Sequence, residues 1–180
     1  NSSLDGPTRS HVTARLRAIN PDILIEFRQA YVGPAMRKYA NMLRAVDCPN
    51  SIGDNRVRTL DVRLMCRDSI VHADPITWHP DEPAASAAMQ IIHAMFSVPQ
   101  ISLKMTELTE THRRMVKQQL SFIREHSDVL LGGCLRPLYP HLLFPLVLAN
   151  TDRKLLVAYY APMPLRLDEE GAWTGVPALQ

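Results

Sequence analysis

Residues 42–58, MLRAVDCPNSIGDNRVR, contain the transition that decides the fold. An apolar run ends at Asp47, and a helical pattern begins after Cys48, Pro49 and Asn50 break the chain. A short buried strand followed by a helix is the repeating unit of a parallel α/β sheet. The stretch therefore predicts one βα unit with a carboxylate at the carboxyl end of its strand.

Three more apolar runs of strand length flank this unit, and segments with apolar residues at helical spacing separate them. An amphipathic helix over residues 7–20 precedes the first strand. The predicted strands are ILIEF (23–27), MLRAV (42–46), IVHAD (70–74) and VPQISLK (98–104), with helices around 36–40 and 57–64, from Glu82 onward, and up to Gly132. This alternation indicates right-handed βαβ units and a parallel sheet.

Four βα units are half of an eight-stranded (β/α)8 TIM barrel, for which about 250 residues are typical. A five-stranded doubly wound sheet fits the same periodicity, but no glycine-rich phosphate loop follows any of the four strands. After Gly133 the chain changes to prolines and short apolar runs, which predict a short antiparallel β segment. We therefore expect two domains, residues 1–132 as half of a barrel and residues 133–180 as the start of a β-sandwich-like domain.

Composition excludes several classes of function. The 180 residues carry a formal net charge of only +2, with basic residues scattered along the chain, which argues against a nucleic-acid partner. No apolar stretch reaches the roughly 18 residues of a membrane span. The 3 cysteines form neither a disulfide framework nor a zinc pattern, so we expect reduced thiols, a cytoplasmic location, no metal and no cofactor.

Charged residues gather at the predicted carboxyl ends of the strands, where the loops of parallel α/β folds converge on functional sites. Carboxylates placed there suit glycosidic bond cleavage, in which one acid protonates the leaving oxygen and a second carboxylate acts at the sugar carbon. The residues are Glu26, Arg28, Arg44, Asp47, His72, Asp74 and Lys104.

Each of these residues also has a structural interpretation. Asp47 fits a helix cap as well as a catalytic acid, and its position alone does not decide between the two. Asp74 precedes a proline and fits a turn, while Glu26 fits an ion pair with Arg28 or Arg44. A single histidine such as His72 is more often a core residue than a ligand.

Other residues are interpreted as structural. Trp78 fits either a sugar-stacking wall or a plug at the barrel edge, with the plug favoured. Three histidines lie on predicted helices too far apart for a metal site. They are His93, His112 and His126. The methionines Met89, Met95 and Met115 lie at helical positions and are expected in the core.

Five segments resemble, in order, the carboxyl half of the catalytic barrel of melibiase-type α-galactosidases, glycoside hydrolase clan D, families 27 and 36. The resemblance covers about residues 10–132. It implies strands 5 to 8 of a (β/α)8 barrel followed by a β-sandwich-like domain, and retaining hydrolysis of terminal α-linked sugars. The segments are PDILIEFRQAYVGPAMRKYANMLRAVDCPN, NRVRTLDVRL, VHADPITWH, FSVPQISLKM and LSFIREHSDVLL.

The resemblance also implies roles for individual residues. The acid/base of the family corresponds to Asp47. The family's nucleophile lies in a Lys-x-Asp motif on the fourth strand, and no such triplet occurs in these 180 residues. Sugar-binding positions of the family correspond to Glu26, Arg28, Gly33, Arg44 and Asp74.

Two functions therefore follow from the sequence. In the first, the chain is a portion of a retaining α-galactosidase-like hydrolase that acts on a carbohydrate substrate. It supplies the acid/base but not the nucleophile, and is inactive without an amino-terminal half. In the second, it is a non-catalytic half-barrel that binds sugar or serves assembly, completing its exposed sheet as a homo-oligomer.

Overall fold

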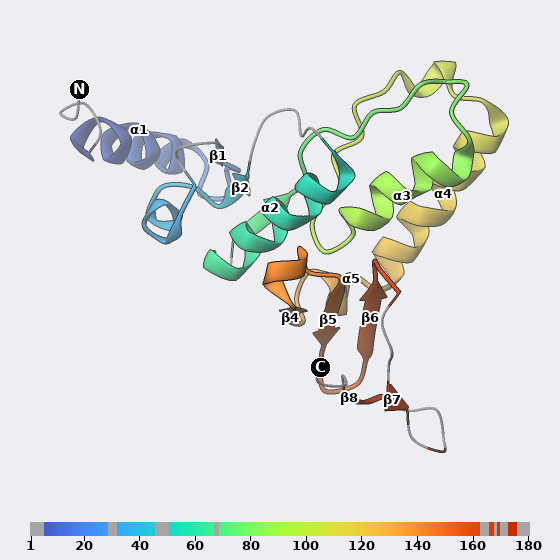
Figure 1. The fold of residues 1–180 in the computed structure, drawn as a ribbon. Coiled ribbons are helices and arrows are strands. Elements are labelled where there is room, and N and C mark those ends of the chain that lie inside the picture. Colours follow the sequence, from blue (N-terminus) through green and yellow to red (C-terminus); the bar gives the residue numbers. More distant parts are fainter. Residues whose placement is uncertain are drawn as a thin grey trace.

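The computed structural model describes residues 6–28, 32–45, 51–66, 69–162, 166–167, 169 and 173–175. Asp47 lies outside the described residues. A small parallel sheet, a group of helices and an antiparallel sheet follow one another along the chain (Figure 1). The mixed α/β class predicted from the sequence is confirmed.

Three short parallel strands form the first sheet in the order β1-β2-β3. They are β1 (Glu26–Arg28), β2 (Met42–Arg44) and β3 (Ile70–His72). Their register places Arg28, Arg44 and His72 side by side at the carboxyl ends. The predicted parallel arrangement is confirmed for these three strands, which are shorter than the apolar runs that contain them.

The segment predicted as a fourth strand runs parallel to β3 without forming a regular strand. Isolated bridges pair Val98 with His72 and Ile101 with Ile76. Pro99 follows the first bridge and has no N–H to donate, and this interrupts a regular ladder. The position of this segment beside β3 agrees with the prediction, but the prediction of a continuous strand was wrong.

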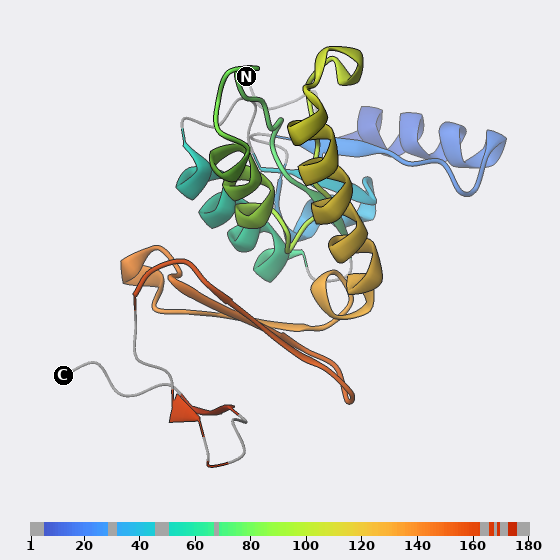
Figure 2. The same ribbon diagram turned by 90° about the vertical axis from the view of Figure 1, so that its right-hand side faces the viewer.

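The described residues form five α-helices beside the sheets, and α2, α3 and α4 lie together (Figures 1 and 2). Short 3-10 helices occur at η2 (Pro34–Lys38), where we predicted a helix over 36–40, at η3 (Met105–Glu107) and at η4 (Pro140–Leu142). None of the described helices is both long and apolar enough to cross a bilayer. The α-helices are α1 (Gly6–Ile19), α2 (Ile52–Met65), α3 (Ala84–His93), α4 (Glu110–Glu125) and α5 (Ser127–Leu130).

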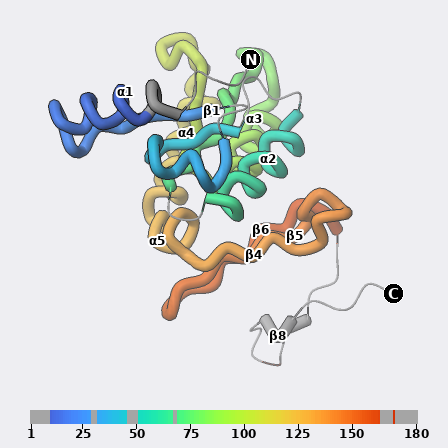
Figure 3. The backbone as a smooth tube through the Cα atoms, turned by 90° about the vertical axis from the view of Figure 1, so that its left-hand side faces the viewer, coloured from blue at the N-terminus to red at the C-terminus, as the bar shows by residue number. Residues whose placement is uncertain are grey.

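Helix α1 projects away from the other helices (Figures 1 and 3). The helix predicted from Val12, Leu16 and Ile19 is confirmed, but its apolar stripe is not covered. Val12 is 53% and Ile19 is 83% exposed. The guanidinium of Arg17 ties the helix to the carbonyls of Lys38 and Tyr39, each at 3.3 Å.

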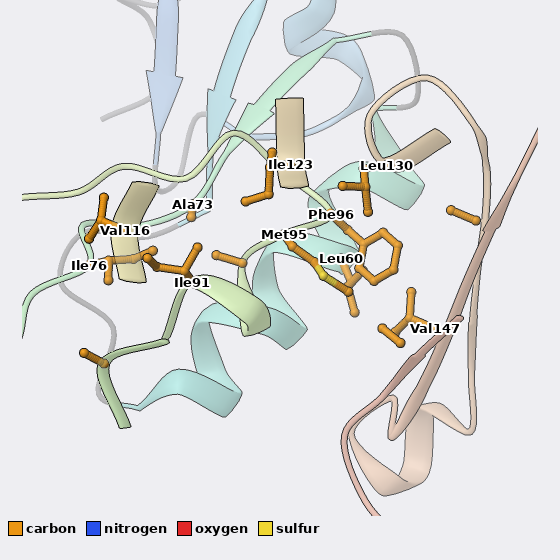
Figure 4. Close-up of a cluster of buried hydrophobic side chains, with 14 of the residues drawn as sticks. Leu60, Ala73, Ile76, Ile91, Met95, Phe96, Val116, Ile123, Leu130 and Val147 are labelled. Atoms are coloured by element: carbon orange, nitrogen blue, oxygen red, sulfur yellow. The ribbon is translucent and has the colours of Figure 1, made fainter. Parts of the chain in front are cut away.

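The main hydrophobic core lies between α2, α3, α4 and the antiparallel sheet (Figure 4). Leu60, Ile91, Val116 and Val147, one from each element, are buried there. Trp78 joins the same cluster at 6% exposure. Its ring is therefore a core group and not a sugar-stacking wall.

Two of the three methionines predicted in the core are buried. Met95 and Met115 are each 8% exposed, whereas Met89 is 39% exposed, so that prediction was wrong. Met89 lies two residues from Ala87 and two from Ile91, both fully buried on α3. Because two residues turn an α-helix by about 200°, Met89 points to the opposite side.

The second sheet is antiparallel, in the order β4-β5-β6. Its strands are β4 (Cys134–Leu138), β5 (Leu146–Asn150) and β6 (Leu155–Tyr159), and a second hairpin joins β7 (Arg166–Leu167) to β8 (Trp173–Gly175). Residues 146–149 of the central strand β5 are completely buried, and Val147 and Ala149 belong to the helical core. The antiparallel segment predicted after Gly133 is confirmed.

Two arginines of α2 hydrogen-bond to backbone carbonyls of other segments, and Arg56 reaches the antiparallel layer; we call this region the junction, defined by Arg56, Arg63, His93 and Tyr160. Arg63 donates to the carbonyls of Phe96, Leu130 and Leu131. Arg56 donates to the Leu143 carbonyl at 2.8 Å, contacts His93 Nδ1 at 3.1 Å, and lies 4.3 Å from the centroid of the Tyr160 ring. Burial lowers the pKa of both guanidinium groups.

The described cysteines are unpaired thiols, with Cys66 buried and Cys134 exposed, while Cys48 lies outside the described residues. Burial raises the pKa of the Cys66 thiol, so it stays protonated near neutral pH. The cytoplasmic location expected from the cysteine count stays a prediction.

Candidate functional site

Side chains from four segments meet around Arg44 and His72, the last residues of β2 and β3, and we call this cluster the rim. Arg44 Nε lies 3.7 Å from Glu26 Oε1 and 4.0 Å from Asp74 Oδ1. Arg44 Nη1 also donates to Gln100 Oε1 at 3.2 Å. The rim consists of Glu26, Arg44, His72, Asp74 and Gln100.

His72 connects β3 to the same cluster. Its Nε2 lies 3.1 Å from Glu26 Oε2, and its Nδ1 lies 3.3 Å from the carbonyl oxygen of Ala73. Both ring nitrogens therefore lie within hydrogen-bond distance of an oxygen atom. The expectation that His72 is a core residue holds for its burial, at 7% exposure, but the ring belongs to the rim.

Burial divides the rim into an open side and a closed side. The side chain of Glu26 is 37% exposed, whereas that of Arg44 is 5% and that of Asp74 is 0% exposed. A carboxylate with no exposed surface does not contact a dissolved sugar directly. Asp74, which we expected among the sugar-binding residues, instead lies 4.0 Å from Arg44 Nε.

The structure places the other two described candidates differently. Arg28 is exposed and shares the sheet face of Arg44, because the two are register partners. Gly33 lies against Cys66, the residue that ends α2. Helix α2 begins at the rim end of the sheet and ends at the other, so the described structure does not bring Gly33 to the rim.

The beginning of α2 bears on the interpretation of Asp47. Ser51 is the N-cap of α2, and its hydroxyl accepts a hydrogen bond from the amide of Asp54 at 3.1 Å. A cap of this kind satisfies an amide that the helix leaves without a partner. The N-cap position is therefore occupied by a residue other than Asp47, and the helix-cap interpretation loses its basis.

Two rim residues were missed as candidates in the sequence. Gln100 was counted only as part of a strand, and His72 was noted at a strand end but left out of the proposed sugar-binding residues, because a single histidine is more often a core residue. The sequence does contain a signal for Gln100. In an extended segment Gln100 shares one face with Val98 and Ser102, because every second residue points to the same side. The contact between His72 and Glu26 has no such signal, since it joins residues 46 positions apart.

A hollow of about 820 Å³ lies at the opposite ends of the strands. Its walls are mostly apolar and include Leu64, Ile70, Val98, Leu131 and Leu135. No group of three or more His, Cys, Asp or Glu side chains among the described residues is arranged to hold a metal ion. The polar chemistry of the described chain is thus concentrated at the rim, away from this hollow.

No family model matches the sequence, and no curated protein matches it. Two solved structures are similar in fold. One is a GH36 α-galactosidase, AgaA of Geobacillus stearothermophilus, in complex with stachyose, with a TM-score of 0.69 and 20% identity over 93% of this chain. The other is the galactosidase domain of an α-galactosidase-sucrose kinase, AgaSK, with a TM-score of 0.62 and 13% identity over 94% of this chain.

The fold of this chain is thus similar to part of two α-galactosidases. This agrees with the resemblance found in the sequence. The chain spans 25% of the length of the first of these structures and 24% of the second.

Proposed function

We propose that the chain is the carboxyl portion of a retaining glycoside hydrolase that removes terminal α-linked galactose, with Asp47 as the acid/base. The observation that carries this proposal is the rim, where Glu26 and Asp74 surround Arg44 at the carboxyl ends of parallel strands. In the sequence, Asp47 comes three residues after Arg44, the last residue of β2.

The division of labour at the rim follows from exposure. Glu26 and Arg28, which are exposed, are the described groups available to sugar hydroxyls. Arg44 supports Glu26 from the closed side and is itself held by Asp74 and Gln100. A fixed guanidinium beside the carboxylate orients Glu26 as a hydrogen-bond acceptor.

We propose further that the parallel layer is half of a (β/α)8 barrel. One sheet face carries Leu43 and Val71, which pack with Val62 and Cys66 of α2. The opposite face carries the rim and, below it, apolar residues that are not covered. Ile70 is 43% exposed there. In a closed barrel, strands outside these 180 residues cover this inner face.

The proposed domains are residues 1–132, forming the half-barrel, and residues 133–180, beginning a carboxyl-terminal β domain. The border falls between α5, which ends at Leu130, and β4, which begins at Cys134.

In the proposed reaction the nucleophilic carboxylate comes from sequence outside these 180 residues, because no Lys-x-Asp triplet occurs within them. Asp47 protonates the leaving glycosidic oxygen as the glycosyl–enzyme bond forms, and then removes a proton from the water that hydrolyses this bond. General acid catalysis of this kind contributes roughly 10²- to 10⁴-fold to the rate. The chain alone is therefore expected to bind sugar without hydrolysing it.

The test is kinetic and uses a longer polypeptide that contains these 180 residues. With Asp47→Ala, we expect glycosylation by an α-galactoside with a poor leaving group to fall by about 10²-fold or more. An aryl α-galactoside with a good leaving group needs little protonation, so its glycosylation falls far less. An unchanged rate with the poor leaving group would remove Asp47 from the acid/base role.

Ser51→Ala is the matched control. This change removes the observed helix cap, which costs about 1 kcal/mol of stability, and leaves the carboxylate of Asp47 in place. If Ser51→Ala reproduces the leaving-group dependence of Asp47→Ala, helix stability and not acid catalysis explains the loss.

A second function is favoured by the uncovered apolar face that includes Ile70. In this alternative the chain is a non-catalytic half-barrel that binds sugar or serves assembly, and two copies cover each other's inner faces. Sedimentation of the 180-residue chain distinguishes the cases, because a stable, folded monomer at micromolar concentration contradicts assembly through this face.

A further inference from the structure

One buried amide links the beginning of α2 to the rim. Asn55 is 4% exposed and lies in the first turns of α2, eight residues after Asp47. Its Nδ2 donates to the Asp74 carbonyl oxygen at 3.3 Å, and its Oδ1 accepts from the Asp74 amide at 3.1 Å. Asn55 therefore bonds both polar groups of the Asp74 backbone.

We propose that Asn55 is a positioning residue of the rim, holding Asp74 so that its carboxylate fixes Arg44. The proposal rests on the proposed function in one respect only, which is the importance of Arg44 to sugar binding. The linkage from Asn55 through Asp74 to Arg44 stands on geometry.

Asparagine suits this position better than chemically similar residues such as aspartate. The amide offers one donor and one acceptor side by side, which matches the carbonyl and N–H of a single residue. Thr59 donates to Asn55 Oδ1 at 3.3 Å, so the amide orientation is held from one turn further along α2. An aspartate here lacks the donor and places a buried negative charge against the fully buried Asp74.

The consequence for the rim follows from burial. Asp74 has no exposed surface, and its position is set by its backbone together with the groups that contact it. Arg44 Nε lies 4.0 Å from Asp74 Oδ1, so a movement of that backbone changes the surroundings of the guanidinium. Asn55 thereby couples the helix that follows Asp47 to the arginine that supports Glu26.

Asn41 provides a matched control within the same sheet. Its Nδ2 donates to the Ile23 carbonyl at 3.0 Å, and its Oδ1 accepts from the Ile25 amide at 2.8 Å. The chemistry is the same amide-to-backbone bridge, but Asn41 precedes β2 and bonds Ile23 and Ile25 instead of Asp74. Loss of this bridge lowers stability without touching Arg44.

The experiment compares Asn55→Asp with Asn41→Asp in the 180-residue chain. The reporter is the Nε–H resonance of Arg44 in ¹H–¹⁵N spectra, together with its exchange with water. We expect both variants to lower Tm. Only Asn55→Asp should displace the Arg44 resonance and accelerate its exchange, by about tenfold or more.

Asn55→Ser and Asn41→Ser form a second pair for the case in which the aspartate variants do not fold. A serine is too short to reach both backbone groups and adds no charge. An Arg44 resonance that is unchanged in a folded Asn55 variant, or equally changed in the Asn41 variant, would overturn the positioning role.

A functional measurement separates this inference from the proposed function. In the longer polypeptide, we expect Asn55→Ser to lower kcat/KM for an α-galactoside about tenfold and Asn41→Ser to leave it nearly unchanged. A displaced Arg44 resonance with unchanged kcat/KM supports the linkage and contradicts the sugar-binding role of the rim. An unchanged resonance contradicts the linkage whatever the kinetics.

Discussion

The rim and the junction both contain buried arginines, but the two regions satisfy them differently. At the rim, Arg44 faces the carboxylates of Glu26 and Asp74. At the junction, Arg63 donates to three backbone carbonyls, and Arg56 donates to a fourth. The rim pairs a guanidinium with carboxylates, whereas the junction hydrogen-bonds guanidinium groups to neutral carbonyl oxygens.

This difference separates a site from a structural contact. Backbone carbonyls are fixed by the fold and have no proton to exchange, so the junction holds two layers together. A carboxylate can accept hydrogen bonds from hydroxyl groups, and the side chain of Glu26 is 37% exposed and so accessible to them. Chemistry is therefore expected at the rim, and the largest stability effects at the junction.

The largest expected effect comes from Arg63→Ala. This change leaves the carbonyls of Phe96, Leu130 and Leu131 without their donor, two of them where α5 ends. Unsatisfied polar groups at these positions cost about 4 kcal/mol in total. Urea unfolding of the variant measures the loss, and Arg63→Lys should recover only part of it. If Arg63→Ala lowers the free energy of unfolding by less than Glu26→Gln does, the rim and not the junction contributes more to stability.

The second effect is the pH dependence of the junction. Burial, and then the charge of Arg56, lower the pKa of His93 from 6.5 to about 4. The unfolded chain therefore binds the proton more tightly than the folded chain. Stability is unaffected above about pH 7, falls as the pH drops below 6.5, and reaches its full loss of about 3 kcal/mol below pH 4.

Unfolding midpoints between pH 7 and pH 4 test this assignment. His93→Gln should flatten the pH dependence, because glutamine has no proton to gain in this range. His79, whose side chain is 75% exposed, provides the control, and His79→Gln should keep the slope of the unchanged chain. Equal slopes for all three proteins would show that His93 does not limit stability in acid.

A smaller effect is expected at the rim from Glu26→Gln. Its ion-pair distances are 3.7 Å to Arg44 and 3.1 Å to His72, but its partial exposure screens both charges. We expect a stability loss of about 1 kcal/mol or less. Isothermal titration with galactose should instead show a clear loss of affinity, and Glu107→Gln, an exposed glutamate away from the rim, should not. A large stability loss with unchanged affinity would make the rim a structural contact.

The smallest effect is expected in the loop that joins β4 to β5. Leu143 has φ 60° and ψ 40°, in the left-handed region, and its side chain is 59% exposed. Asparagine adopts this conformation at lower cost than leucine, so Leu143→Asn should raise stability by about 0.5 kcal/mol. The Arg56 bond to the backbone carbonyl at this position is unchanged. A decrease in Tm would show that the exposed leucine side chain contributes more than the backbone strain costs.

Much of the fold could be predicted from local patterns. Alternation of apolar runs with helical spacing located β1 to β3, α1 to α4 and the later antiparallel strands. The patterns overestimated strand lengths, since Asn41 takes the backbone bonds of Ile23 and Ile25 that a longer strand would make. They also assigned Met89 to the core, because a methionine on a helix does not itself reveal which side is buried.

The rim could be predicted only in part. Glu26, Arg44 and Asp74 were found because strand ends converge in parallel sheets, and the structure brings these three together. Gly33 was assigned to the same region by resemblance, but it lies against Cys66 at the other end of α2. Asp47 lies outside the described residues, so its acid/base role stays a proposal.

The sequence by itself determined which segments are strands and helices, because periodicity and chain-breaking residues act over a few positions. It also determined which strands end in charge. Only the tertiary structure decided that Asp74 is buried behind Arg44 while Glu26 stays open, and that Asn55 and His72 join the same cluster. Burial and pairing depend on segments tens of residues apart, and no local pattern records which of them meet.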